Sequence, residues 1–169
     1  KLHHELGDIM LANVLIVRDN KSLEKAYNEI HDIETRFKDV KCLDTQDWAN
    51  PSPSFINQLY CMIHLSKIIT KSALMRDEFR GSHYKPKFDL NQPKGFDPHE
   101  YIDYLEQKQY GEVNMERFPP GHLDYMQRFE ANNKKWLKTT VAQYKNNLPE
   151  ITYEDVNTSL VTPRPRKYD

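Results

Sequence analysis

The sequence contains few glycines and cysteines, and these shortages exclude several kinds of site. Only 5 of the 169 residues are glycine, and no two of them fit the spacing of a dinucleotide-binding or phosphate-binding loop. The two cysteines, Cys42 and Cys61, lack the spacing of a metal site and predict free thiols in a reducing compartment. The seven histidines form no HExxH motif and no i, i+4 pair. The sequence therefore indicates neither a nucleotide-binding loop nor a metal centre.

The chain also lacks an excess of positive charge and any long apolar run. It has 24 Lys and Arg against 25 Asp and Glu, which argues against nucleic acid as the main partner. No segment reaches the roughly 18 consecutive apolar residues that a membrane-spanning helix needs. The N-terminus has no apolar signal core and no initiator Met, so we expect a fragment or a processed product.

The first 83 residues show three helical patterns. Apolar residues recur at helical spacing from Leu2 to Val14 and again from Leu23 to Phe37, with Asp19 or Asn20 placed to cap the second helix. A third helix is expected to begin at Ser52 or Ser54, to be apolar on most sides, and to stop at Gly81. Three antiparallel helices packed at shallow angles satisfy these patterns.

The remainder is charged, rich in tyrosine and interrupted by proline. Residues 98–110 and 122–136 predict short helices, and residues 136–145 and 150–161 predict a β-hairpin around an Asn-Asn-Leu-Pro link. The predicted fold is mainly α: a three-helix antiparallel bundle, a long irregular region with short helices, and a small C-terminal hairpin. We expect a bundle over 1–83, an insertion over 84–135, and the hairpin with an extended basic tail over 136–169.

The densest group of candidate functional side chains lies in the stretch RDEFRGSHYKPKF. Arg76, Glu78, Arg80 and His83 fit either a catalytic base with a cationic clamp or a buried charge network. The network is favoured because the sequence offers neither a cofactor fingerprint nor a second acid beside it. The other histidines of the first part fit structural or solvated positions: His31 and His64 as hydrogen-bonded structural residues, and His3 and His4 as solvated ones.

This stretch resembles the R-x-E-S-R-G-x-H-x-[RK] signature that ends the helical domain of succinate dehydrogenase and fumarate reductase flavoprotein subunits. Phe79 stands where the signature has Ser. Residues 132–145, with Trp136, are similar to the D-E-N-W-L-K-H-T-L-A segment of that family, and the end of the chain is similar to its P-P-x-R-x-Y close. The resemblance rests on these matched positions: Glu5, Ile9, Met10, Val14, Arg18, Leu23, Ala26, Arg76, Glu78, Arg80, Gly81, Ser82, His83, Lys85 and Trp136.

The resemblance implies a C-terminal domain that follows a flavin domain and carries no catalytic, cofactor-binding or metal-binding residue of its own. It implies FAD in the parent protein, iron–sulfur clusters in a partner subunit, and a membrane anchor that exchanges electrons with quinone. The parent would be a peripheral subunit on the cytoplasmic face of a bacterial membrane, or on the equivalent matrix side. We expect the family-signature residues to brace the domain. The insertion is expected to expose its tyrosines, Tyr101, Tyr104, Tyr110 and Tyr125. We expect the partner subunit to contact Tyr101, Tyr104, Arg164, Arg166 and Tyr168, because Tyr and Arg are frequent in interface cores.

Two alternatives remain open from the sequence. An L-aspartate oxidase shares the three helices and the R-G-x-H segment but works without an iron–sulfur partner. A freestanding helical interaction module is compatible with the composition. Direct flavin binding by this chain is disfavoured because it has no phosphate-binding glycines.

Overall fold

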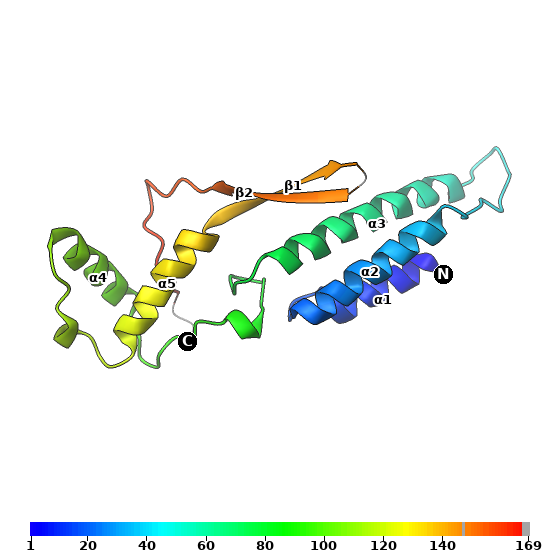
Figure 1. The fold of residues 1–169 in the computed structure, drawn as a ribbon. Coiled ribbons are helices and arrows are strands. Elements are labelled where there is room, and N and C mark those ends of the chain that lie inside the picture. Colours follow the sequence, from blue (N-terminus) through cyan, green and yellow to red (C-terminus); the bar gives the residue numbers. More distant parts are fainter. Residues whose placement is uncertain (147, 167–169) are drawn as a thin grey trace. The chain divides into compact units, whose positions relative to one another are not determined.

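A computed structural model describes residues 1–146 and 148–166 (Figure 1). Its elements confirm the predicted mainly α fold, with a helical bundle, short helices and a C-terminal hairpin. The chain divides into two compact units. Unit 1 contains residues 1–88 and 140–152, and unit 2 contains residues 89–139 and the segment that begins at residue 153. The three-part division predicted from the sequence stays a proposal.

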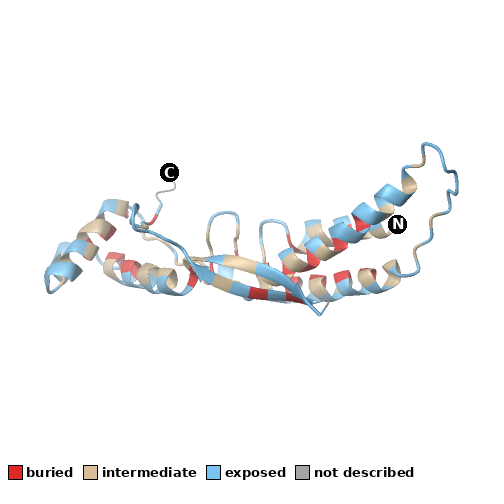
Figure 2. Ribbon diagram, turned by 90° about the horizontal axis from the view of Figure 1, so that it is seen from above, coloured by how far each residue is buried: buried red, intermediate tan, exposed pale blue. Residues whose placement is uncertain are grey.

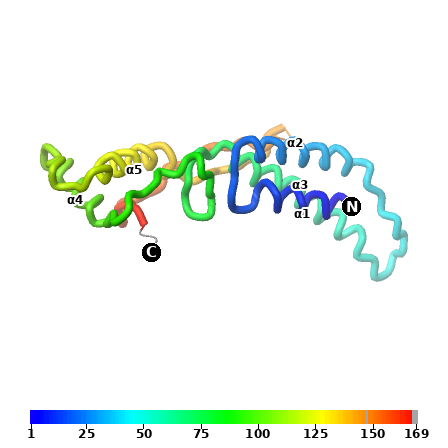
Figure 3. Tube along the Cα trace, turned by 90° about the horizontal axis from the view of Figure 1, so that it is seen from below, coloured from blue at the N-terminus to red at the C-terminus, as the bar shows by residue number. Residues whose placement is uncertain are grey.

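Unit 1 is built on three helices that lie alongside one another (Figure 3). Helix α1 spans Leu2–Asn13 and helix α2 spans Asn20–Phe37. The side chain of Asp19 accepts a hydrogen bond from the Ser22 backbone N–H, 2.9 Å away, which confirms the predicted cap. Four side chains of α2 turn to the core and are fully buried: Leu23, Ala26, Ile30 and Ile33.

Helix α3 spans Ser52–Met75 and packs mainly on α2. Leu59 and Ile63 of α3 join Leu6, Ile30 and Ile33 in one apolar core. Buried residues of the chain are red in Figure 2. Each such side chain contributes about 1.5–3 kcal/mol on burial, so this core holds the three helices together. The helix begins at Ser52, as predicted, but the prediction that it runs on to Gly81 is wrong, because Arg76 is already extended (φ −100°, ψ 97°).

The hairpin pairs strand β1, Lys138–Lys145, with strand β2, Leu148–Asp155. Asn146 follows β1 with φ 52°, a left-handed conformation that Asn tolerates at turns. Strand β2 starts at Leu148, two residues before the predicted start at residue 150. It ends at Asp155 instead of residue 161, because the described chain after Asp155 is no longer in strand conformation.

Unit 2 contains helix α4, Pro98–Tyr110, and helix α5, His122–Trp136, whose bounds match the predicted ones. Short 3₁₀ turns lie at Pro86–Phe88 in unit 1 and at Met115–Arg117 in unit 2. Asp97 and Glu100 form a capping box at the start of α4, which explains why that helix begins at Pro98. An aromatic cluster forms the core of the unit: Phe96, Tyr101, Tyr104, Phe118, Tyr125 and Met126.

The aromatic core corrects one expectation. The tyrosines of this insertion were expected to be exposed, but Tyr101, Tyr104 and Tyr125 are 3%, 4% and 6% exposed, because their rings pack on one another and on Phe96 and Phe129. Tyr110 is exposed, as expected. The tyrosines of this region thus build a core of their own before they offer any surface to a partner.

Candidate functional site

The charged stretch after α3 forms a tight loop. Arg80 and His83 exchange two backbone hydrogen bonds of 3.1 Å around Gly81 and Ser82. Gly81 has φ 59° at the first position of this two-residue turn, where residues other than glycine are strained. The glycine therefore shapes this turn instead of ending the helix, and the turn pairs the backbone of His83 with that of Arg80.

Glu78 is the centre of the loop and has no exposed surface. Its Oε1 accepts a hydrogen bond of 2.6 Å from Arg76 Nε, and its Oε2 accepts one of 2.9 Å from Arg80 Nε. A second guanidinium nitrogen of Arg76, Nη1, donates to Thr140 Oγ1 of β1 at 2.8 Å. Since a carboxylate without partners is very costly to bury, the two arginines are what allow Glu78 to lie inside the unit.

His83 continues the network as a neutral side chain. Its Nε2 lies 2.8 Å from the carbonyl oxygen of Arg76, which can only accept, so Nε2 carries the proton. Its Nδ1 then accepts from Arg18 Nη1 at 2.7 Å. Burial lowers the pKa of His83 below its ordinary value of 6.5, and the nearby cations Arg18 and Lys85 act in the same direction. Both ring nitrogens are thus engaged in fixed contacts.

Arg18 and Lys85 tie the loop to the connection between α1 and α2. The backbone N–H of Arg18 donates to the Tyr84 carbonyl at 2.8 Å, and its side chain donates to the carbonyls of Val14 and Leu15. In Figure 3 the loop after α3 runs beside this connection. These contacts explain how a loop distant in sequence is fixed to the first helix.

Lys85 is almost completely buried. Its ammonium donates to the Leu74 carbonyl at 3.1 Å and to Asp77 Oδ1 at 3.0 Å. Asp77 also accepts from Asn20 Nδ2, at the start of α2, at 3.0 Å. Burial lowers the pKa of Lys85, while Asp77 opposes the shift. We call these side chains together the Glu78 network: Arg18, Arg76, Asp77, Glu78, Arg80, His83 and Lys85.

The arrangement is that of a structural clamp. The carboxylates of Asp77 and Glu78 face cations at hydrogen-bond distance, and the imidazole of His83 is fixed between a guanidinium and a carbonyl. Sequence reasoning named Arg76, Glu78, Arg80 and His83 but did not place Arg18 or Asp77 with them. The break in helical pattern near Arg18 was the available signal, since it marks the connection where the loop is attached.

A second polar cluster joins the hairpin to the helices of unit 1. His64 Nδ1 lies 2.9 Å from the hydroxyl of Tyr144 on β1, and Lys67 donates to Glu34 at 2.6 Å. Burial, followed by the charge of Glu34, raises the pKa of Tyr144 to about 12. His31 also contacts Glu34, at 3.1 Å, so both His31 and His64 are hydrogen-bonded, as predicted.

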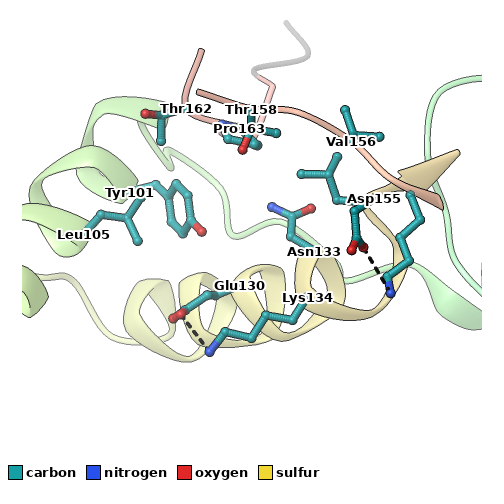
Figure 4. Close-up of a pocket in the computed structure, with 12 residues that line it drawn as sticks. Tyr101, Leu105, Glu130, Asn133, Lys134, Asp155, Val156, Thr158, Thr162 and Pro163 are labelled. Atoms are coloured by element: carbon teal, nitrogen blue, oxygen red, sulfur yellow. Dashed lines mark ion pairs between the residues drawn. The ribbon is translucent and has the colours of Figure 1, made fainter. Parts of the chain in front are cut away.

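Unit 2 contains a shallow hollow of about 340 Å³ beneath the C-terminal segment (Figure 4). Leu105, Leu137 and Val156 give it apolar walls, and two ion pairs lie at its rim. Lys134 pairs with Glu130 at 3.1 Å, and Lys138 pairs with Asp155 at 3.3 Å. Thr162 and Pro163 of the C-terminal segment line the hollow, so this segment forms part of its wall.

The remaining predicted residues are the family-signature residue Trp136 and the five expected to contact a partner subunit. Trp136 is buried, with its ring 5.7 Å from the ring of Tyr153. Arg164 and Arg166 are exposed on either side of the buried Pro165, while Tyr168 lies outside the described residues. Tyr101 and Tyr104 are core residues, and burial raises the pKa of Tyr101 to about 12. Contact of Tyr101, Tyr104, Arg164, Arg166 and Tyr168 with a partner subunit stays a prediction.

The described part of the chain contains neither a candidate metal cluster nor a candidate membrane-spanning helix. Among residues 1–146 and 148–166, no cluster of three or more His, Cys, Asp or Glu side chains could hold a metal ion. Across the same residues, no helix combines the length and the apolar character needed to cross a membrane.

Comparison with known proteins decides the family. Residues 3–168 match the family described as the C-terminal part of the fumarate reductase flavoprotein. The chain belongs to this family. It is 35% identical over 169 residues to the succinate dehydrogenase flavoprotein subunit of Bacillus subtilis, covering 99% of this chain and 22% of that protein. It is 24% identical over 169 residues to the fumarate reductase flavoprotein subunit of Haemophilus influenzae, again covering 99% and 22%.

The fold of this family member also matches solved structures. A chain in a structure of Escherichia coli quinol fumarate reductase aligns with a TM-score of 0.64 at 20% identity, over 96% of this chain and 21% of that one. The chain thus spans about a fifth of the length of the relatives it matches. The expectation that it is a C-terminal domain of a succinate dehydrogenase or fumarate reductase flavoprotein is confirmed.

Loss of the Glu78 carboxylate should destabilise the protein strongly. Replacing Glu78 with Gln leaves Arg76 and Arg80 without their counter-charge, and removal of one partner of a buried pair costs on the order of 3 kcal/mol when part of the network reaches solvent. Urea unfolding of the Glu78→Gln protein measures this loss. The matched control is Glu24→Gln, an exposed site on α2, which should change the free energy of unfolding by less than about 0.5 kcal/mol. Equal stability of the two variants would contradict the clamp.

Acid should weaken the clamp through His83. Because its folded pKa lies below 6.5, the folded state binds fewer protons than the unfolded state, so the stability that neutral His83 contributes is lost as the pH falls below 6.5. Unfolding midpoints at pH 7.5 and pH values below 6.5 should therefore differ more for the unaltered protein than for His83→Gln. His99→Gln, at an exposed position, serves as the control and should keep the full pH dependence.

Proposed function

We propose that this chain supports the flavin-binding part of a succinate dehydrogenase or fumarate reductase flavoprotein subunit and contributes a contact surface for an iron–sulfur subunit. The observation that carries the proposal is the match over the whole chain, 3–168 in the family and 35% identity over 169 residues to a succinate dehydrogenase flavoprotein subunit. The relatives named above are succinate dehydrogenases or fumarate reductases, which favours this function over that of an aspartate oxidase or a freestanding module.

The residues of this chain do not fit the phosphates of FAD. Its glycines are isolated, and Gly81, the one in the charged loop, serves a turn whose side chains contact one another. FAD, which exchanges hydride with the dicarboxylate in such enzymes, would therefore be held by the rest of the parent protein. The proposed role of this chain is to hold its own surfaces in fixed positions. The Glu78 network contributes to this role because its contacts join the segment after α1, the start of α2 and the end of α3.

The exposed part of unit 2 supports a contact with a partner subunit. Arg164 and Arg166 project from a segment stiffened by Pro163 and Pro165, of which Pro165 is buried. A stiff segment loses little conformational entropy on binding, and exposed guanidinium groups pair well with carboxylates. In the proposed complex, a membrane anchor exchanges electrons with quinone, and the iron–sulfur subunit carries electrons to that anchor. The flavoprotein subunit that contains this surface would therefore be peripheral to the membrane.

The function is tested on the full-length subunit that contains this sequence. Purified with its flavin, the subunit should reduce an artificial electron acceptor when succinate is added, and malonate, a dicarboxylate without the reacting hydrogens, should inhibit it. A subunit that binds flavin but oxidises aspartate instead of succinate would overturn the proposal in favour of an aspartate oxidase. A chain that folds and carries no flavin-binding part would overturn it in favour of an interaction module.

The tail should matter for assembly more than for activity. Truncation after Val161 should weaken co-purification of the iron–sulfur subunit, and so should the double variant Arg164→Glu/Arg166→Glu, which keeps both prolines and the residues that line the hollow. Lys94→Glu, an exposed charge reversal elsewhere in unit 2, is the control and should leave co-purification unchanged. Normal co-purification of the iron–sulfur subunit with the double variant would show that the tail arginines are not part of the interface.

A further inference from the structure

Unit 1 contains a cavity of about 460 Å³ whose walls come from two segments, residues 17–21 and 85–88. The backbone of Val17 pairs with that of Tyr84, and this pairing sets the two segments side by side. The second segment then forms the 3₁₀ turn Pro86–Phe88, in which the Phe88 N–H donates to the Lys85 carbonyl at 2.9 Å. The volume lies within the range of about 300–1,000 Å³ that is usual for sites of small organic ligands.

The walls of this cavity are mostly apolar. Val17, Pro86 and Phe88 supply apolar side chains, and Val17 is 64% exposed. Apolar surface that stays in contact with water is unfavourable, so a ligand with an apolar body would gain free energy by covering it. Apolar walls with a few charged groups are the usual composition of a small-molecule site.

The charged groups of the cavity are predominantly positive. Four cationic side chains and a single carboxylate line it, although the net charge of the whole chain is −1. The cations are Arg18, Lys21, Lys85 and Lys87. The carboxylate is that of Asp19, which already accepts the Ser22 N–H as the cap of α2. A concave site lined by charges of one sign concentrates ligands of the opposite sign, so the cavity favours an anion.

Two of the lysines hold their charge beside the apolar wall. The ammonium groups of Lys85 and Lys87 lie 5.7 Å and 5.9 Å from the centre of the Phe88 ring. An ammonium has three N–H donors, and within the described residues that of the buried Lys85 donates to Leu74 and Asp77 only. An anion in the cavity would accept the third donor. It would also favour the charged form of Lys85, whose pKa burial lowers.

We propose that this cavity binds a small organic anion that has an apolar body, such as an aryl or alkyl carboxylate. The body would pack on Val17, Pro86 and Phe88, and the anionic group would pair with the ammonium groups of Lys85 and Lys87. A four-carbon dicarboxylate is charged at both ends and would leave the apolar walls uncovered. The ligand therefore differs from the substrate of the proposed function, and the cavity is a second site.

Equilibrium dialysis of naphthoate against the full-length subunit tests the proposal, with malonate present to occupy any dicarboxylate site. Naphthoate should bind, and its uncharged analogue naphthalenemethanol should bind at least about tenfold more weakly. Lys87→Glu and Lys21→Glu each reverse an exposed charge of the cavity and should weaken naphthoate binding at least about tenfold. Lys25→Glu is the matched control, because Lys25 is exposed one turn further along α2 and does not line the cavity.

Four results would overturn the proposal. Naphthoate that fails to bind at about 1 mM would show that the cavity takes no such ligand. Equal binding of naphthalenemethanol would show that the cations do not contribute. Unchanged binding in both Lys87→Glu and Lys21→Glu would place the naphthoate elsewhere, and an equal loss in Lys25→Glu would reduce the effect to general surface charge. Because binding is measured directly, these results do not depend on whether the subunit oxidises succinate.

Discussion

The burial of the Glu78 carboxylate is the constraint on which the rest of unit 1 depends. A buried carboxylate is tolerated only with close cationic partners, and here Arg76 and Arg80 supply them from the same loop. Arg76 also reaches Thr140 of the hairpin, and its carbonyl holds His83, which in turn accepts from Arg18 after α1. One charge therefore fixes the end of α3, the hairpin and the α1–α2 connection in a single arrangement.

This arrangement favours a structural role over a catalytic one for the charged stretch after α3. A catalytic base needs a free lone pair and a place for substrate, whereas the His83 nitrogens and the Glu78 oxygens are held by neighbours at 2.6–2.9 Å. These contacts join the loop to the connection after α1, to the end of α3 and to the hairpin. The proposed function of the chain rests on the surfaces that this arrangement holds in place.

Much of this organisation could be predicted from local sequence patterns. The Asp19 cap, the apolar stripe of α2 and Pro98 at the start of α4 are signals carried by neighbouring residues, and the structure confirms all three. The contacts that sequence reasoning missed link residues far apart: Arg18 with His83, and His64 with Tyr144. Gly81 was misassigned because a glycine after an apolar helix fits a helix end and a tight turn equally well. The tyrosines of the insertion were expected to be exposed. Their spacing in the sequence does not reveal that their rings pack on one another.

The most direct test of the account is the nucleotide sequence upstream of the codon for Lys1 in the source gene. If this chain is the structural end of a flavoprotein subunit, the reading frame continues upstream and encodes a strand, a GxGxxG loop and a helix, the unit that binds the FAD pyrophosphate. A start codon within a few residues of Lys1 would contradict the account, because the chain would then be a freestanding module.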